Sequence, residues 1–183
     1  MRRLAAIPLI FAVVLAAAVS DYASVKHKFD SIESDRLPAG SRIELTPAEL
    51  TAYAVKEAPP GVRNPQLQFG SGKLVTGSAL VDFLKVQHGQ GQQPGWLMSK
   101  LLDGERPVSV TARIQSSGGR ATVDVERVEI SGIVIDGRTL DFLIQNVLLA
   151  LYPSAVVGRP FELGHRIERL DVRPGNVVVA IGR

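Results

Sequence analysis

Strict alternation of apolar and polar residues over 108–115 is the feature that most limits what this chain can form. The alternating residues are, in order, Val108, Ser109, Val110, Thr111, Ala112, Arg113, Ile114 and Gln115. A period of two is typical of an antiparallel strand with one buried face and one solvated face. Gly118-Gly119 then allows the chain to turn back, so the sequence predicts a hairpin.

The return strand of this hairpin is out of phase with itself. Val123 and Val125 share one face. The numbers of Val128 and Ile130 differ from theirs by odd amounts, so in an unbroken strand these two side chains would lie on the opposite face. One extra residue near Glu126-Arg127 would bring all four side chains to the same face. The sequence therefore predicts a β-bulge at that point.

Other segments extend the sheet. We expect a hairpin of 66–69 and 73–86 with a bend at Gly77, a short strand at 133–135, and a terminal hairpin of 166–172 and 177–181. Thr46-Pro47-Ala48-Glu49 has the pattern of a helix start. Thr46 supplies a hydroxyl cap, Pro47 occupies the first helical position, and the Glu49 side chain can reach back to the backbone N–H of the cap residue. A helix over about 47–57 should follow, and Pro59-Pro60-Gly61 should end it.

A second main helix, at about 140–152, is apolar nearly all round. Its polar strip consists only of Asp141, Gln145 and Asn146. Such a helix must be enclosed, because a surface helix needs a wider polar face. Enclosure by a wrapped sheet and an additional face toward lipid or a bound acyl chain are compatible alternatives. A shorter helix at about 95–102 carries Trp96.

The predicted fold class is therefore α+β, with a highly curved antiparallel sheet wrapped around one or two helices. We expect this domain over 41–183. Residues 21–40 are polar with isolated apolar residues and end in Pro-Ala-Gly, which favours a tether or a frayed helix.

The first 20 residues are typical of an exported protein. Arg2 and Arg3 precede an apolar run from Leu4 to Val19. Small residues before Asp21 favour a cleaved signal, whereas the run is also nearly long enough for a single membrane anchor, so both alternatives stay open. In either case the arginines place the body outside the cytoplasm, in the periplasm or at the extracytoplasmic face of the membrane.

Composition excludes several kinds of chemistry. The 183 residues contain no cysteine, which excludes disulfides, thiol catalysis and iron–sulfur sites. The formal charge of +3 falls to +1 without Arg2 and Arg3 (19 basic against 18 acidic residues), and the basic residues are dispersed. We therefore expect no nucleic-acid partner.

No catalytic, metal or cofactor site is predicted. His27, His88 and His165 lack the spacing of metal ligands. The glycine-rich segments 70–73 and 89–94 match only fragments of phosphate-binding loops, and no serine stands in a nucleophile elbow. We expect a protein that is not an enzyme.

Three segments resemble a known family. They are Ile43 to Ala52, Gly72 to Gly77, and Leu170 to Val179 with its Arg173-Pro174-Gly175-Asn176 turn. Over about 41–182 the chain is similar to LmeA-type phospholipid-binding envelope proteins, although it has Thr51 and Asn176 where the family tends to have Asn and Gly. The resemblance implies a tubular lipid-binding-like fold, in which a curved sheet wraps a long helix.

Two functions follow as hypotheses. The first is an exported binding protein for a lipid or another amphiphile, attached to the membrane by its N-terminal segment. Its candidate groove residues are Leu143, Val147, Leu151, Trp96 and Phe83. The second is a structural or assembly module of the cell envelope that meets a protein partner through a strand edge or the Trp96 helix.

Overall fold

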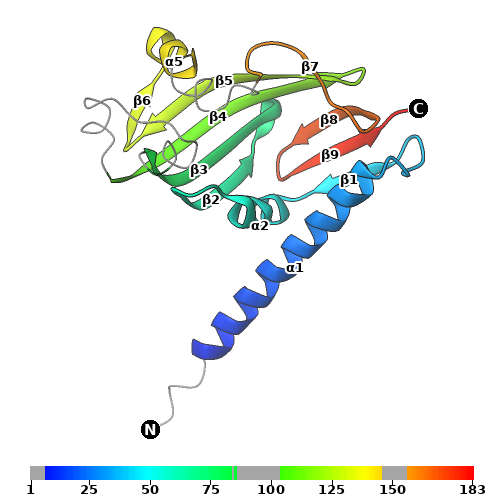
Figure 1. Cartoon of the computed structure of the whole chain (residues 1–183), viewed down its shortest axis with the longest axis horizontal. Coiled ribbons are helices and arrows are strands. Elements are labelled where there is room, and N and C mark those ends of the chain that lie inside the picture. Colours follow the sequence, from blue (N-terminus) through cyan, green and yellow to red (C-terminus); the bar gives the residue numbers. More distant parts are fainter. Residues whose placement is uncertain (1–6, 84, 86–103, 146–155) are drawn as a thin grey trace.

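The computed structural model (Figure 1) describes residues 7–83, 85, 104–145 and 156–183, of which 7–18, 142 and 143 are described by their backbone alone. Its helices are α1 (Ile7–Glu33), α2 (Pro47–Glu57), the single turn η1 (Ser71–Lys73) and α5 (Gly137–Leu143). Its strands are β1 (Arg42–Leu45), β2 (Val62–Phe69), β3 (Leu74–Asp82), β4 (Glu105–Ser117), β5 (Arg120–Ile130), β6 (Ile133–Ile135), β7 (Phe161–Glu162), β8 (Ile167–Arg173) and β9 (Asn176–Ile181).

The strands form two sheets. The large sheet has the order β2-β3-β4-β5-β6, with β7 paired to the far end of β5, and the small sheet has the order β1-β9-β8. Every strand pairing in the described residues is antiparallel. The predicted α+β class with antiparallel sheets is therefore confirmed.

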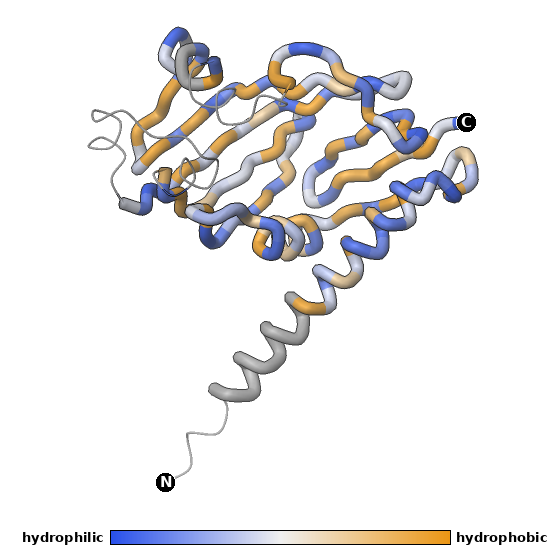
Figure 2. The backbone as a smooth tube through the Cα atoms, in the orientation of Figure 1, coloured by the Kyte–Doolittle hydropathy of each residue, from blue (hydrophilic) through white to orange (hydrophobic). Residues whose placement is uncertain are grey.

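The hairpin of β4 and β5 contains the predicted bulge. Thr111 lies opposite Arg127 and Ala112 lies opposite Val125, which leaves Glu126 as the extra residue. The bulge places Val128 opposite Val110, on the same face as Val125. Figure 2 shows hydrophobic and hydrophilic residues alternating along these long strands.

The small sheet and the C-terminal half of α1 enclose the most deeply buried cluster of the described residues. Val25 is fully buried, and Ile32, Leu45, Val179 and Ile181 are at most 6% exposed. Phe29 packs against the same cluster, so α1 contributes residues 25, 29 and 32, which lie on one face of a helix.

Residues 21–33 are thus part of the folded unit, which corrects the tether or frayed helix expected for 21–40. α1 continues without a break to Glu33, and its last turns lie beside β1 while its N-terminal half extends away from the sheets (Figure 1). Burial of three apolar side chains in the cluster stabilises this helix against fraying. Among the residues whose side chains are described, no helix is long and apolar enough to cross a membrane.

α2 has the predicted bounds and the predicted start. The Glu49 amide donates to Thr46 Oγ1 (3.2 Å), and the Thr46 amide donates to Glu49 Oε2 (3.0 Å), which completes a capping box. The Leu67 amide of β2 donates to Thr51 Oγ1 (3.0 Å). α2 therefore joins α1 and the small sheet on one side to the edge strand of the large sheet on the other.

Of two further helix predictions, the described residues cover one in part and the other not at all. α5 begins at Gly137, earlier than the expected 140, and its Leu140 is 6% exposed. The rest of the expected helix at 140–152, from residue 146 on, and the expected helix at 95–102 lie outside the described residues. The terminal hairpin is confirmed as β8 and β9.

Candidate functional site

The residues predicted to line a groove are described unevenly. Phe83 directly follows β3 and is half-buried. Leu143 is the last residue of α5, and its side chain is not described. Trp96, Val147 and Leu151 lie outside the described residues. The described part of the chain therefore leaves these five as a prediction.

The register of the large sheet assembles an apolar surface that the sequence analysis did not single out. Residues directly opposite in antiparallel strands project to the same face, and side chains alternate along each strand. By these two rules Val110 shares a face with Gly77 and Val128, and Val108 shares it with Ala79 and Ile130. The next strands continue this face on both sides.

We call this surface the apolar sheet face. It comprises Leu67, Phe69, Val75, Gly77, Ala79, Val81, Val108, Val110, Ala112, Ile114, Val123, Val125, Val128, Ile130 and Ile135. These residues are half-buried, in contrast to the cluster of the small sheet, whereas Ala121, which the register with Ser116 places on the same face, is 2% exposed. Ile133 at the end of the same face is 69% exposed.

The opposite face of the large sheet carries several polar contacts, together with the apolar residues Leu74, Leu80 and Val134. Thr76 and Thr111 share a hydrogen bond of 3.0 Å between their hydroxyls. Arg113 pairs with Glu126 at 2.6 Å, and Arg127 pairs with Glu129 at 3.1 Å. One side of the sheet is therefore mixed in chemistry, whereas the apolar sheet face consists almost entirely of apolar residues.

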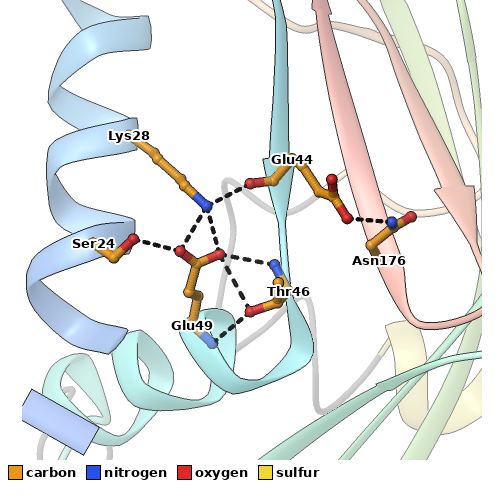
Figure 3. Close-up of polar contacts among 6 residues, drawn as sticks. All are labelled: Ser24, Lys28, Glu44, Thr46, Glu49 and Asn176. Carbon is orange, nitrogen blue, oxygen red and sulfur yellow. Dashed lines mark hydrogen bonds and ion pairs between the residues drawn. The ribbon is translucent and has the colours of Figure 1, made fainter. Parts of the chain in front are cut away.

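A cluster of polar side chains lies between α1 and α2 (Figure 3). Lys28 Nζ contacts both carboxylate oxygens of Glu49, at 2.6 and 2.8 Å, and also donates to the Glu44 carbonyl (2.7 Å). Ser24 Oγ donates to Glu49 Oε1 at 2.6 Å. Glu49 itself is only 5% exposed. The group ties the first helix to the second at the border of the buried cluster.

The pKa of Glu49 decides whether its carboxylate can act as a base toward Ser24. Burial acts to raise the pKa of Glu49, but hydrogen bonds from Lys28, Ser24 and the Thr46 amide outweigh it and lower the pKa to about 2. A carboxylate with so low a pKa is a weak base, and it does not activate Ser24 as a nucleophile. The arrangement is a structural ion pair rather than a catalytic pair.

The hollows among the described residues are open to solvent and are lined by both polar and apolar residues. One of about 450 Å³ lies at the turn end of the large sheet and is lined by Lys73, Gln115, Ser117, Arg120 and Thr122, among others. One of about 270 Å³ lies near Asn64, Ser109 and Glu129. Within the described ranges, no group of three or more acidic or histidine side chains is placed to hold a metal ion.

The sequence contained a signal for the apolar sheet face. The alternation over 108–115 identified one strand's contribution, but the other strands could be added only once their register was known.

The chain matches no family model, no curated protein and no solved structure.

Proposed function

We propose that this protein binds the hydrocarbon chain of a lipid or another amphiphile on the apolar sheet face. The observation that supports the proposal most is the continuity of that face across β2 to β6, with half-buried aliphatic side chains throughout. A continuous apolar face must be covered from water, and the proposal assigns part of that cover to hydrocarbon.

The energetics favour hydrocarbon as the occupant. Each methylene group moved from water to an apolar surface contributes about 0.8 kcal/mol, and no directional contact is needed. β4 extends from residue 105 to 117, and at a rise of about 3.4 Å per residue it is long enough to accompany an extended acyl chain. This chemistry also explains why a binding protein can lack any catalytic or cofactor motif.

The finer features of the proposal come from the sequence. The large sheet would curve around the helical segments that carry Leu143, Val147, Leu151 and Trp96, with Phe83 at one end of the groove. The resemblance to LmeA-type envelope proteins agrees with this arrangement. The N-terminal segment would direct export and, if it is retained, hold the domain at the outer side of the membrane.

A matched pair of substitutions tests the proposal. Val110 and Thr111 are neighbours in β4 with side chains on opposite faces. Val110→Glu places a charge on the apolar sheet face, and we expect it to abolish capture of a radiolabelled C16 fatty acid by the full chain in phosphatidylcholine nanodiscs. Thr111→Glu should leave capture unchanged. A folded Val110→Glu protein that captures the fatty acid as well as the wild type would overturn the proposal.

A protein partner remains the second candidate, and one observation favours it. β6 is the last strand in the order of the large sheet, and its Ile133 and Val134 are 69% and 43% exposed. An exposed apolar edge is a template for another strand. Replacement of Val134 by Lys would weaken such a contact without affecting amphiphile capture.

A further inference from the structure

We propose that Arg106 binds the anionic headgroup, a phosphate ester or a carboxylate, of the amphiphile whose chain lies on the apolar sheet face. This inference rests on the proposed function and deepens it. It assigns the ligand a charge and also a direction on the sheet, with its head at the Arg106 end of β4.

The position of Arg106 follows from the register. Arg106 lies opposite Val81, and it precedes Val108 by two residues in β4. Because side chains two residues apart share a face, Arg106 belongs to the same face as Val108, Val110 and Ala112. Among the described residues it places a positive charge at the end of an otherwise aliphatic surface.

The contacts of Arg106 differ from those of its neighbours. Arg63, 63% exposed, pairs with Glu105 of β4, and Arg127, 54% exposed, pairs with Glu129 two residues further along β5. Arg106 is half-buried, and no hydrogen bond or ion pair joins it to any residue that the structure describes. Arg106 is thus a half-buried cation with no counter-ion among the described residues, which leaves it available to an anion from outside the chain.

The nearest acids do not supply that anion. Glu105 and Asp82 lie opposite each other and one residue away from Arg106 and Val81, which places them on the other face of the sheet. Glu105 pairs with Arg63 at 2.9 Å, and Asp82 pairs with Lys85 at 2.9 Å. The Arg106 guanidinium, with its planar set of donors, suits the paired oxygens of a phosphate or carboxylate group.

The other end of the sheet provides the competing location. Lys73 and Arg120 line the hollow at the turn end, beside Ser117 at the far end of β4 from Arg106. Lys73 and Arg120 are exposed, whereas Arg106 is half-buried beside aliphatic residues. Desolvation strengthens a charge–charge contact, so the head of an amphiphile should favour the Arg106 end.

The test compares two C16 probes on the full chain in phosphatidylcholine nanodiscs. One is hexadecyl phosphate, and the other is hexadecyl maltoside, which has the same chain and no charge. We expect Arg106→Gln to weaken capture of hexadecyl phosphate about tenfold, as for loss of one charge-assisted contact, and to leave capture of the maltoside unchanged. Arg106→Lys should recover part of the loss. Arg42→Gln, which removes an exposed charge from β1, should have no effect.

Direction is tested with a photoreactive diazirine placed beside the phosphate. The expected crosslinks lie near 81 and 106, and crosslinks near 73 and 120 would overturn the inference. Equal capture of both probes by wild type and Arg106→Gln would also overturn it while leaving the proposed function intact. Failure of both probes to bind the apolar sheet face would contradict the proposed function itself. Displacement of hexadecyl phosphate from the wild type by millimolar inorganic phosphate alone would assign Arg106 to a free anion instead of a headgroup.

Discussion

The two sheets of this protein treat apolar residues in different ways. In the small sheet, apolar side chains meet α1 and reach nearly complete burial, with Val25 fully buried and Ile181 2% exposed. In the large sheet, a longer apolar face is half-buried over most of its length, with Ala121 at one end 2% exposed. The small sheet therefore belongs to the structural core, whereas most of the apolar sheet face is only partly shielded from water, and this is where we propose that a ligand binds.

The largest difference should appear when the same charge is placed in each region. Val25→Glu buries a carboxylate in the cluster of α1 and the small sheet, and we expect a loss of about 4 kcal/mol in the free energy of unfolding, or failure to fold. Val110→Glu should cost clearly less, because its site is half-buried. Chemical denaturation measures both. Equal losses would remove the distinction between the two regions.

The pH dependence of unfolding sharpens the comparison, because Glu49, whose pKa is strongly lowered, lies on the α1 side. The pKa of Glu49 is about 2 in the fold and close to its ordinary value in the unfolded chain, so the unfolded state takes up the proton first as the pH falls. The stabilisation is present above about pH 4.5 and is lost between there and pH 2, with a limit of about 3 kcal/mol. Denaturation at pH 6 and pH 3 measures the loss.

Glu49→Gln is the control for this experiment. The amide cannot titrate, so the variant should be less stable at pH 6 and should lose little further stability at pH 3. A variant with the same acid dependence as the wild type would show that another group is responsible.

A smaller effect is expected at the junction of the two sheets. Ser116 Oγ of β4 donates to the Leu170 carbonyl (2.8 Å) and accepts from the Leu170 amide (2.6 Å) of β8. Ser116→Ala should lower the free energy of unfolding by about 1–2 kcal/mol, because two backbone groups lose their partner. The neighbouring Ser117→Ala, at an exposed position, should change it by less than about 0.5 kcal/mol. Similar effects of the two substitutions would contradict the role of Ser116.

Local features of the fold were predictable from the sequence because local residues cause them. The capping box needs only Thr46 and Glu49, and the bulge at Glu126 follows from the phase of four apolar residues. The packing of 21–33 was missed, since Val25, Phe29 and Ile32 are isolated among charged residues and their shared face has meaning only beside the small sheet.

The candidate site was less predictable for a similar reason. One strand showed its apolar side in the sequence, but the apolar sheet face needs five strands in register, and that register depends on pairings between residues far apart in the chain. The position of Arg106 on this face depends on the same pairings. Four of the five groove residues chosen from sequence have no described side chain, so they stay predictions.

The most direct measurement is a map of where a bound acyl chain touches the protein. A C16 fatty acid with a diazirine at mid-chain, photolysed on the full chain in phosphatidylcholine nanodiscs, can be located by peptide mass spectrometry. We predict crosslinks at alternating positions of β4 and β5, including 108, 110, 112, 125 and 128. Crosslinks confined to the N-terminal half of α1, with none on the large sheet, would contradict the binding of an amphiphile on the apolar sheet face.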